Sequence, residues 1–148
     1  MRLSCQKAFL LLLVSTIGCT DSTGPLTLPA QFDLENINGR QLPTYFSPTP
    51  GLTPTILSAS LTLDNAGKAV MTEHRRAFDG TEATITNTFD YRIKDNHIEI
   101  GSFEPCPINA MCIGTLKGTI SGETLSLIVV QISINGSIIY NYRIAPTL

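Results

Sequence analysis

The sequence predicts an all-β domain, an antiparallel up-and-down meander of about eight or nine strands closed into a small barrel. No segment after Pro29 has a long helical period. Short stretches of alternating apolar and polar residues fill the chain, and turn signals such as Asn38-Gly39 and Asp79-Gly80 separate them. Sequential hairpins favour a meander, and closure removes the exposed edges of an open sheet.

The first residues have the organisation of an export signal. Arg2 and Lys7 are positive, Ala8 to Val14 is an unbroken apolar run, and mostly small residues follow. The run is too short to span a bilayer, which needs about 20 apolar residues. We therefore expect residues 1–18 to be a signal peptide that is removed on export.

The segment Thr16-Ile17-Gly18-Cys19 resembles the bacterial lipobox, in which a small residue precedes the cysteine that receives the lipid. Thr16 stands where the lipobox usually has leucine. The resemblance implies lipidation of Cys19, and the alternative is an unrelated cysteine beside an ordinary cleavage site. Because residues 20–25 are polar and turn-prone, we expect a flexible tether over 19–30, followed by the barrel domain over 31–148.

Alternation predicts the strands in order. They are Phe32–Ile37, Leu42–Phe46, Thr55–Leu63, Ala69–His74, Ala83–Ile93, Ile98–Ile100, Ile113–Ile120, Leu125–Val129 and Ile138–Ile144. Pro43 indicates that the second is an edge or part of a long irregular loop. In the fourth, alternation does not decide which face is buried. The segment Ala83–Ile93 has a wholly polar second face and is the clearest half-buried strand.

Two cysteines, Cys106 and Cys112, remain after Cys19. An exported chain meets an oxidising environment, where such a pair is expected to form a disulfide, here closing a loop between two strands. The alternative is a metal pair or a redox dithiol. The spacing is not C-x-x-C, and no histidine lies between or directly beside the two cysteines, so the disulfide is favoured.

Four parts of the chain carry a further resemblance: Gly18–Pro25, Phe32–Gly39 with Leu42-Pro43, and the hairpins Leu61–Gly67 and Gly118–Leu127. With these segments the mature chain resembles the lipocalin-like small β-barrel lipoproteins of bacteria. The resemblance implies a lipocalin-like barrel held at the cell envelope, and it brings no active site with it. We expect a lipid anchor in the outer membrane, with the domain on the periplasmic or the surface face.

Charge argues against nucleic acid as a partner. The 148-residue chain has a formal net charge of -2, and loss of Arg2 and Lys7 makes the mature domain more acidic. It has no basic run with which to neutralise phosphates. We expect a monomer without a cofactor.

Polar residues give little sign of catalysis. The run Glu73-His74-Arg75-Arg76 is interpreted as a solvated strand end, and the alternative is an anion-binding or catalytic patch at a barrel mouth. A metal site would need His74 and His97 together with Glu99 or Asp90, and nothing in the sequence brings them together. No G-x-S-x-G turn is present. We therefore assign no catalytic and no metal-binding residues.

The sequence favours a binding module, which holds a small apolar ligand or contacts an envelope protein. Large side chains could line or fill the barrel, and the candidate ligand-binding residues are Phe89, Tyr91, Tyr140 and Tyr142. The alternatives are a structural envelope protein and an enzyme with an unrecognised site.

Lipidation at Cys19 makes a direct prediction. Replacement Cys19→Ser removes the thiol that would carry the lipid, so the variant should accumulate as an unprocessed precursor. Metabolic labelling with a fatty acid and membrane fractionation would measure this. Normal labelling and fractionation of the variant would contradict the assignment.

Overall fold

The computed structural model describes residues 26–45, 54–103, 115–131 and 136–145, and it is all-β throughout these ranges. The strands are β1 (Ala30–Ile37), β2 (Arg40–Gln41), β3 (Thr44–Tyr45), β4 (Thr55–Leu63), β5 (Lys68–Arg76), β6 (Glu82–Lys94), β7 (His97–Gly101), β8 (Leu116–Ser121), β9 (Thr124–Gln131) and β10 (Gly136–Ile144). The strand predicted over Leu42–Phe46 is replaced by β2 and β3, which flank Pro43, because proline cannot donate to a ladder.

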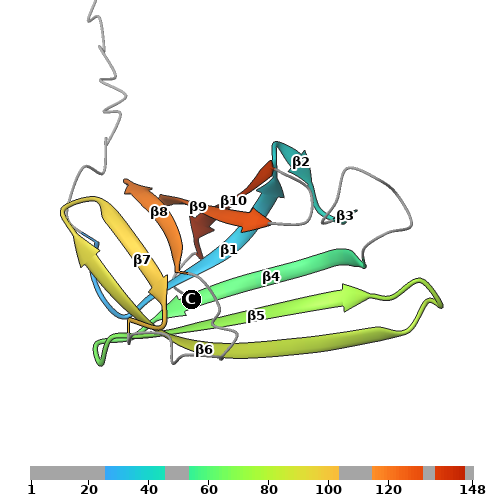
Figure 1. Ribbon diagram of the computed structural model, residues 1–148, viewed down its shortest axis with the longest axis horizontal. Coiled ribbons are helices and arrows are strands. Elements are labelled where there is room, and N and C mark those ends of the chain that lie inside the picture. The colour runs from blue at the N-terminus through green and yellow to red at the C-terminus, as the bar shows by residue number, and fades with distance from the viewer. Residues whose placement is uncertain (1–25, 46–53, 104–114, 132–135, 146–148) are drawn as a thin grey trace, which may run out of the picture.

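These strands form one 10-stranded sheet in the order β2-β1-β10-β9-β8-β7-β6-β5-β4-β3. An additional pairing of β1 with β4 closes the ring, so that the described residues form an 8-strand antiparallel barrel in which β2 and β3 are short additions (Figure 1). Neighbours in the ring follow one another along the chain. The predicted up-and-down meander and lipocalin-like closed barrel are therefore confirmed.

The strand β1 divides its pairing between two partners along one edge. Over Ala30–Asp33 it pairs with Leu63–Ser60 of β4, whereas Asn36 and Ile37 pair with β2. A β-bulge lies between these stretches, at Leu34/Asn36 in the register with β10. The ring is therefore closed along only part of β4.

Side-chain hydrogen bonds hold the bulged end of β1 to β10. The Asn36 Oδ1 accepts a 2.7 Å bond from Asn141 Nδ2 and a 3.1 Å bond from the Gly39 backbone N–H. The Asn38-Gly39 turn has positive φ at both residues, as the hairpin signal predicts, and the Asn38 backbone N–H donates to Ile139 O at 2.8 Å. These bonds direct the end of β1 away from β4.

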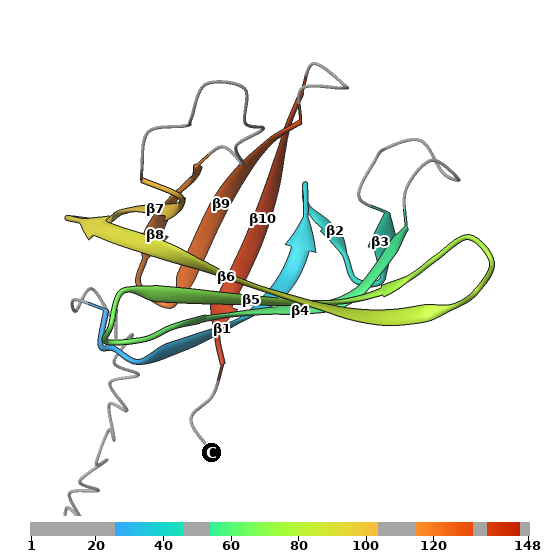
Figure 2. The ribbon, with the colours of Figure 1, turned by 60° about the horizontal axis from the view of Figure 1, so that its bottom comes forward.

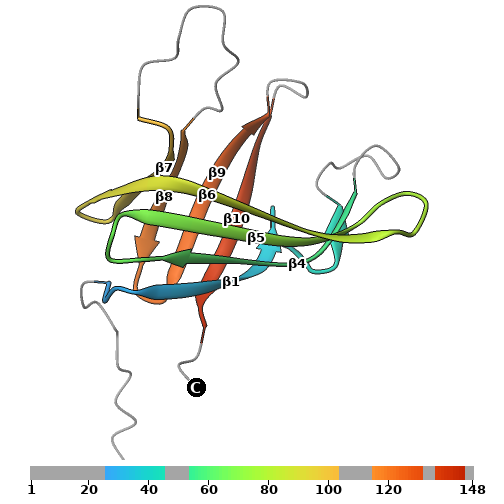
Figure 3. The same cartoon turned by 90° about the horizontal axis from the view of Figure 1, so that it is seen from below.

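Beyond this closure, β4, β5 and β6 continue as a three-stranded arm, which we define as residues 55–59, 72–76 and 82–88 (Figures 1, 2 and 3). The far end of β4 pairs with β3 over only two residues, and β7 pairs with β6 only over Asp90–Lys94. The hairpin tip at Gly80, where φ is 84°, lies at the free end of the arm.

The prediction that β6 is half-buried is confirmed for Phe89, Tyr91 and Ile93 but is wrong for residues 82–88, which are exposed on both faces. Alternation correctly assigns Ala83 and Ile85 to the inward face. The arm extends past the ring, however, so the described part of the chain does not cover this face.

The core lies inside the ring. Its buried apolar members are Ala30, Phe32, Leu34, Ile37, Ile56, Ala59, Leu61, Leu63, Ala69, Ile98, Ile100, Leu125, Leu127, Ile138, Tyr140 and Tyr142. Burying one large apolar side chain contributes about 1.5–3 kcal/mol, so this cluster supplies the main stabilisation of the barrel.

Several predicted features fall at or beyond the limits of the described residues. Cys19, Cys106 and Cys112 lie outside them. The strand β1 begins at Ala30, one residue before the predicted start of the domain, and Leu26 and Leu28 from the predicted tether pack against the core. Within the described ranges, no helix is long and apolar enough to cross a membrane.

Close packing between β8 and β9 predicts that Gly118→Ala is destabilising. A Cβ at position 118 would lie 2.5 Å from Ser126 O and 2.6 Å from Leu127 Cδ2, so strands must shift to admit it. We expect a loss of about 1–3 kcal/mol in the free energy of unfolding, measured by urea denaturation. The control Thr119→Ala changes an exposed neighbour and should stay within about 0.5 kcal/mol. Equal stability of both variants would contradict the packing.

Candidate functional site

The four predicted ligand-binding residues all contact one core. Tyr140 and Tyr142 of β10 are buried and stack with ring centroids 6.3 Å apart and an interplanar angle of 20°. Phe89 and Tyr91 of β6 are half-buried and pack against the same cluster. The structure therefore places the aromatic side chains of β6 and β10 around a common interior.

Tyr91 has a structural contact that distinguishes it from the other three. Its hydroxyl donates a 2.5 Å hydrogen bond to Asp64 O, and its backbone N–H donates to Gly67 O at 2.9 Å. Both acceptors belong to the turn between β4 and β5. Tyr91 therefore fixes this turn, and its hydroxyl is already satisfied.

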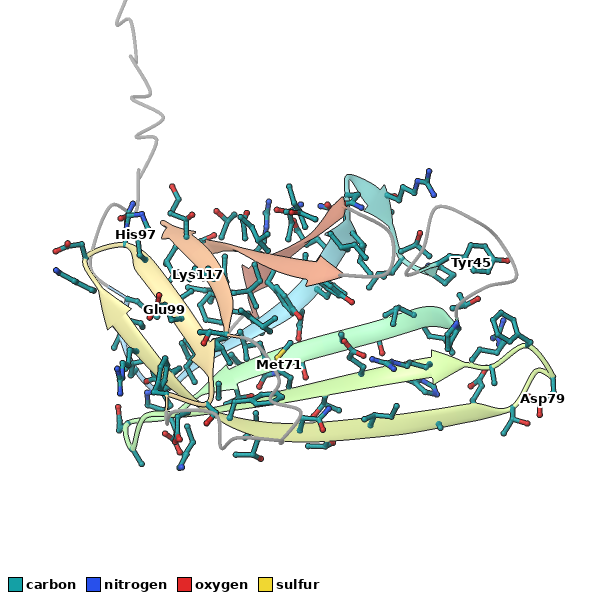
Figure 4. All side chains as sticks on the ribbon, in the orientation of Figure 1. Tyr45, Met71, Asp79, His97, Glu99 and Lys117 are labelled. Atoms are coloured by element: carbon teal, nitrogen blue, oxygen red, sulfur yellow. The ribbon has the colours of Figure 1, made fainter. Side chains whose placement is uncertain are left out.

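Two charged residues that the sequence assigned to a solvated strand end face inward. Glu73 and Arg75 share a strand face with Ala69, which is fully buried, and with Met71, which packs against the core (Figure 4). The side chains of Glu73 and Arg75 are only 12% and 31% exposed, and the Arg75 Nε donates a 2.6 Å hydrogen bond to Glu73 Oε2. The solvated interpretation is therefore wrong for Glu73.

It is confirmed for the other two residues of the run, which point to the outer face. The side chains of His74 and Arg76 are 40% and 50% exposed and both contact Glu82, at 3.2 Å and 2.7 Å. The hydrogen bond from Arg76 lowers the pKa of the Glu82 carboxyl, and the charge of His74 adds to this effect. This exposed group lies on the surface opposite the barrel interior.

The tyrosine pair lies close to the inward ion pair. Burial raises the pKa of the Tyr140 hydroxyl above its usual value, and the negative charge of Glu73 raises it further, while Arg75 acts in the opposite direction. Burial, with a smaller contribution from Glu73, also raises the pKa of Tyr142. Both tyrosines therefore keep their hydroxyl protons at physiological pH.

The hydroxyl of Tyr142 is buried and makes no hydrogen bond within the described residues. The side chain itself is only 1% exposed. Leaving such a donor unpaired costs about 1–3 kcal/mol, because water solvates it in the unfolded chain. Within the described core, Tyr142 is therefore the one buried polar side chain whose hydroxyl makes no hydrogen bond.

The residues that a metal site would need are spread over different strands. His97 and Glu99 lie on β7, where Glu99 pairs with Lys117 at 3.5 Å (Figure 4). His74 is on β5 opposite Thr84 of the arm. The described part of the chain contains no group of three or more His, Cys, Asp or Glu residues arranged to hold a metal ion.

No family model, curated protein or solved structure matches this chain.

The interior group of Glu73, Arg75 and Tyr142 can bind by hydrogen bonding. Arg75 uses its Nε and Nη2 for Glu73, so its Nη1 has no partner among the described residues. The ion pair is neutral overall. The group can therefore donate hydrogen bonds to an acceptor without requiring a strongly charged ligand. Alternation alone did not predict that Glu73 and Arg75 face inward. Their even spacing from Ala69, which places all three on one face of the strand, was visible in the sequence.

The different surroundings of two tyrosine hydroxyls predict opposite effects on stability. Tyr142→Phe removes a buried donor without a partner and should raise the free energy of unfolding by about 1 kcal/mol. Tyr91→Phe removes the bond to Asp64 O and should lower it by about 1 kcal/mol. Urea denaturation of both variants tests the pair. A loss of stability in Tyr142→Phe would show that its hydroxyl is satisfied within the protein.

Proposed function

We propose that this protein binds a small ligand at the arm end of its barrel, a ligand with an apolar body and a polar head that accepts hydrogen bonds. The observation that carries the proposal is the buried Tyr142 hydroxyl, which has no partner among the described residues and lies near the inward Glu73–Arg75 pair. Phenylalanine would fill the same space without the cost of an unpaired donor. A ligand with a hydrogen-bond acceptor would pair with this hydroxyl and so explain why the position holds tyrosine.

The surrounding side chains suit an apolar body. Met71 and Phe89 face inward from β5 and β6 and are only partly buried. Asn87 pairs with Met71 in the register and faces the same way, yet it is exposed. Solvent therefore reaches the inward face here. Barrels of about eight strands are filled by side chains or hold one small ligand, which limits the body to a single chain or ring system.

The hydrogen-bond donors in the interior determine which polar head group the ligand can have. Tyr142 offers an O–H and Arg75 offers its Nη1, while Glu73 balances the guanidinium charge. A carboxylate, hydroxyl or carbonyl head accepts such bonds, whereas a quaternary ammonium head cannot. We therefore propose selection by hydrogen-bond acceptance more than by net charge.

We further propose that this binding takes place at the cell envelope, where a lipid on Cys19 would hold the domain as a lipocalin-like lipoprotein. This part of the proposal rests on the export signal, the lipobox resemblance and the expected disulfide between Cys106 and Cys112. The proposed role is non-catalytic, because the inward carboxylate of Glu73 is engaged by Arg75.

Three probes with the same ten-carbon tail test the head group: decanoate, 1-decanol and decyltrimethylammonium. Calorimetric titration of the wild-type protein should give tighter binding of decanoate and decanol than of the ammonium probe. Tyr142→Phe should weaken decanol binding by about tenfold and leave the ammonium probe unchanged, because only the first loses a hydrogen bond.

Tyr91→Phe is the matched control, since it also removes one tyrosine hydroxyl but should not alter affinity for any probe. Failure of all three probes to bind, or equal effects of the two variants on decanol, would contradict the proposal.

A further inference from the structure

One edge of β6 is unpaired over residues 82–88 of the described chain. The strand pairs with β5 from Glu82 to Asp90, but on its other side β7 pairs only from Asp90 to Lys94 (Figures 1 and 3). The other strands that end the sheet, β2 and β3, have only two residues each. Among the described residues, the arm therefore presents the one long free strand edge.

The direction of the backbone groups follows from the ladder. The Tyr91 N–H donates to Gly67 O at 2.9 Å, and at the other end of the hairpin the Ala77 N–H donates to Thr81 O at 2.8 Å. Bonded residues alternate along an antiparallel pair, so the odd-numbered residues of β6 bond to β5. The N–H and C=O groups of Glu82, Thr84, Thr86 and Thr88 consequently point outward from the free edge.

This edge has little of the usual protection against strand pairing. Proteins commonly guard long edges with charged residues, above all lysine, with proline or with a bulge. Glu82 is the only charged residue in 82–88, the stretch contains no lysine or proline, and its register with β5 is regular throughout. Threonine and isoleucine instead favour the extended conformation. Ile85, at the middle of the stretch, is 38% exposed.

We propose that the free edge of β6 pairs antiparallel with the same edge of a second copy of this chain, with Ile85 on the twofold axis. In this register Thr84 pairs with Thr86 of the other copy and Glu82 with Thr88, so all four outward residues form hydrogen-bonded pairs. Ile85 faces its own equivalent on the inward side. The proposed dimer differs from the monomer expected from the sequence.

The stretch is self-complementary in this register. Threonine pairs and an apolar pair are favourable across strands, and no like charges stand directly opposite. A register one step further toward the C-terminus would place Glu82 opposite Asp90. The antiparallel arrangement also carries the two barrel bodies to opposite ends of the shared sheet, because β7 leaves β6 at its Asp90–Lys94 end. An isologous contact of this kind closes at two copies.

Thr86→Pro tests the edge without touching the ladder to β5. Proline removes an N–H that points away from β5, and edge strands tolerate it there. Sedimentation of the purified protein over a concentration series should show a wild-type dimer and at least about tenfold weaker association of Thr86→Pro. The control Thr86→Val keeps the N–H and should dimerise normally. A wild-type protein that remains monomeric up to about millimolar concentration, where specific association begins, would overturn the proposal.

A crosslink tests the register and does not depend on the proline variant folding. Ile85→Cys places two thiols across the axis in a non-hydrogen-bonded pair, about 4.5 Å apart between Cα atoms, within the range of a disulfide. Oxidation should link position 85 to itself, identified by mass spectrometry of the linked peptide. Ala83→Cys lies off the axis and should not link to itself. Linkage of position 85 to a different protein, or of position 83 to itself, would overturn the proposed pairing.

Discussion

The divided pairing of β1 is the constraint on which the rest of the structure depends. Its first half closes the ring against β4, and its second half is held to β10 and β2 by the bulge and the Asn36 hydrogen bonds. Because β1 turns away, β4 continues without a ring partner on that side. The strand β5 follows β4 with a β-bulge at Ile56/Ser58, and β6 follows β5 in regular register. The arm results from this change of partner, and the free edge of β6 additionally depends on β7, which pairs with β6 only over Asp90–Lys94.

The same constraint explains how charged residues remain inside the barrel. An ion pair enclosed in a dry core loses several kcal/mol of hydration per charge, which its Coulomb attraction barely offsets. The Arg75 side chain stays 31% exposed and therefore partly hydrated, while the more buried Glu73 accepts its hydrogen bonds. The partial exposure of Arg75 therefore lowers the cost of the pair.

Local sequence predicted the strands and turns well but not which face of β5 is buried. The rows Ala69-Met71-Glu73 and Val70-Thr72-His74 each mix apolar and polar residues, so alternation could not separate them. The structure decides through the preceding turn, where Leu63 pairs with Ala69 and Gly67 has a φ of 80°. A glycine in this left-handed conformation at the end of a three-residue hairpin loop sets the register. The signal for the inward Glu73 was thus in the turn rather than in the strand.

Alternation also could not reveal that half of β6 is exposed. The pattern over Ala83–Ile93 records which side chains face inward, but burial additionally requires a layer opposite them, and that depends on where β1 and β7 end their pairing. Once that layer is absent, the arm has two separate surfaces. Its edge groups lie in the plane of the sheet, whereas inward side chains stand perpendicular to it. The proposed strand pairing would use the edge of β6, whereas the proposed ligand would contact inward side chains of β5 and Tyr142 of β10, so the two proposals do not compete for the same groups.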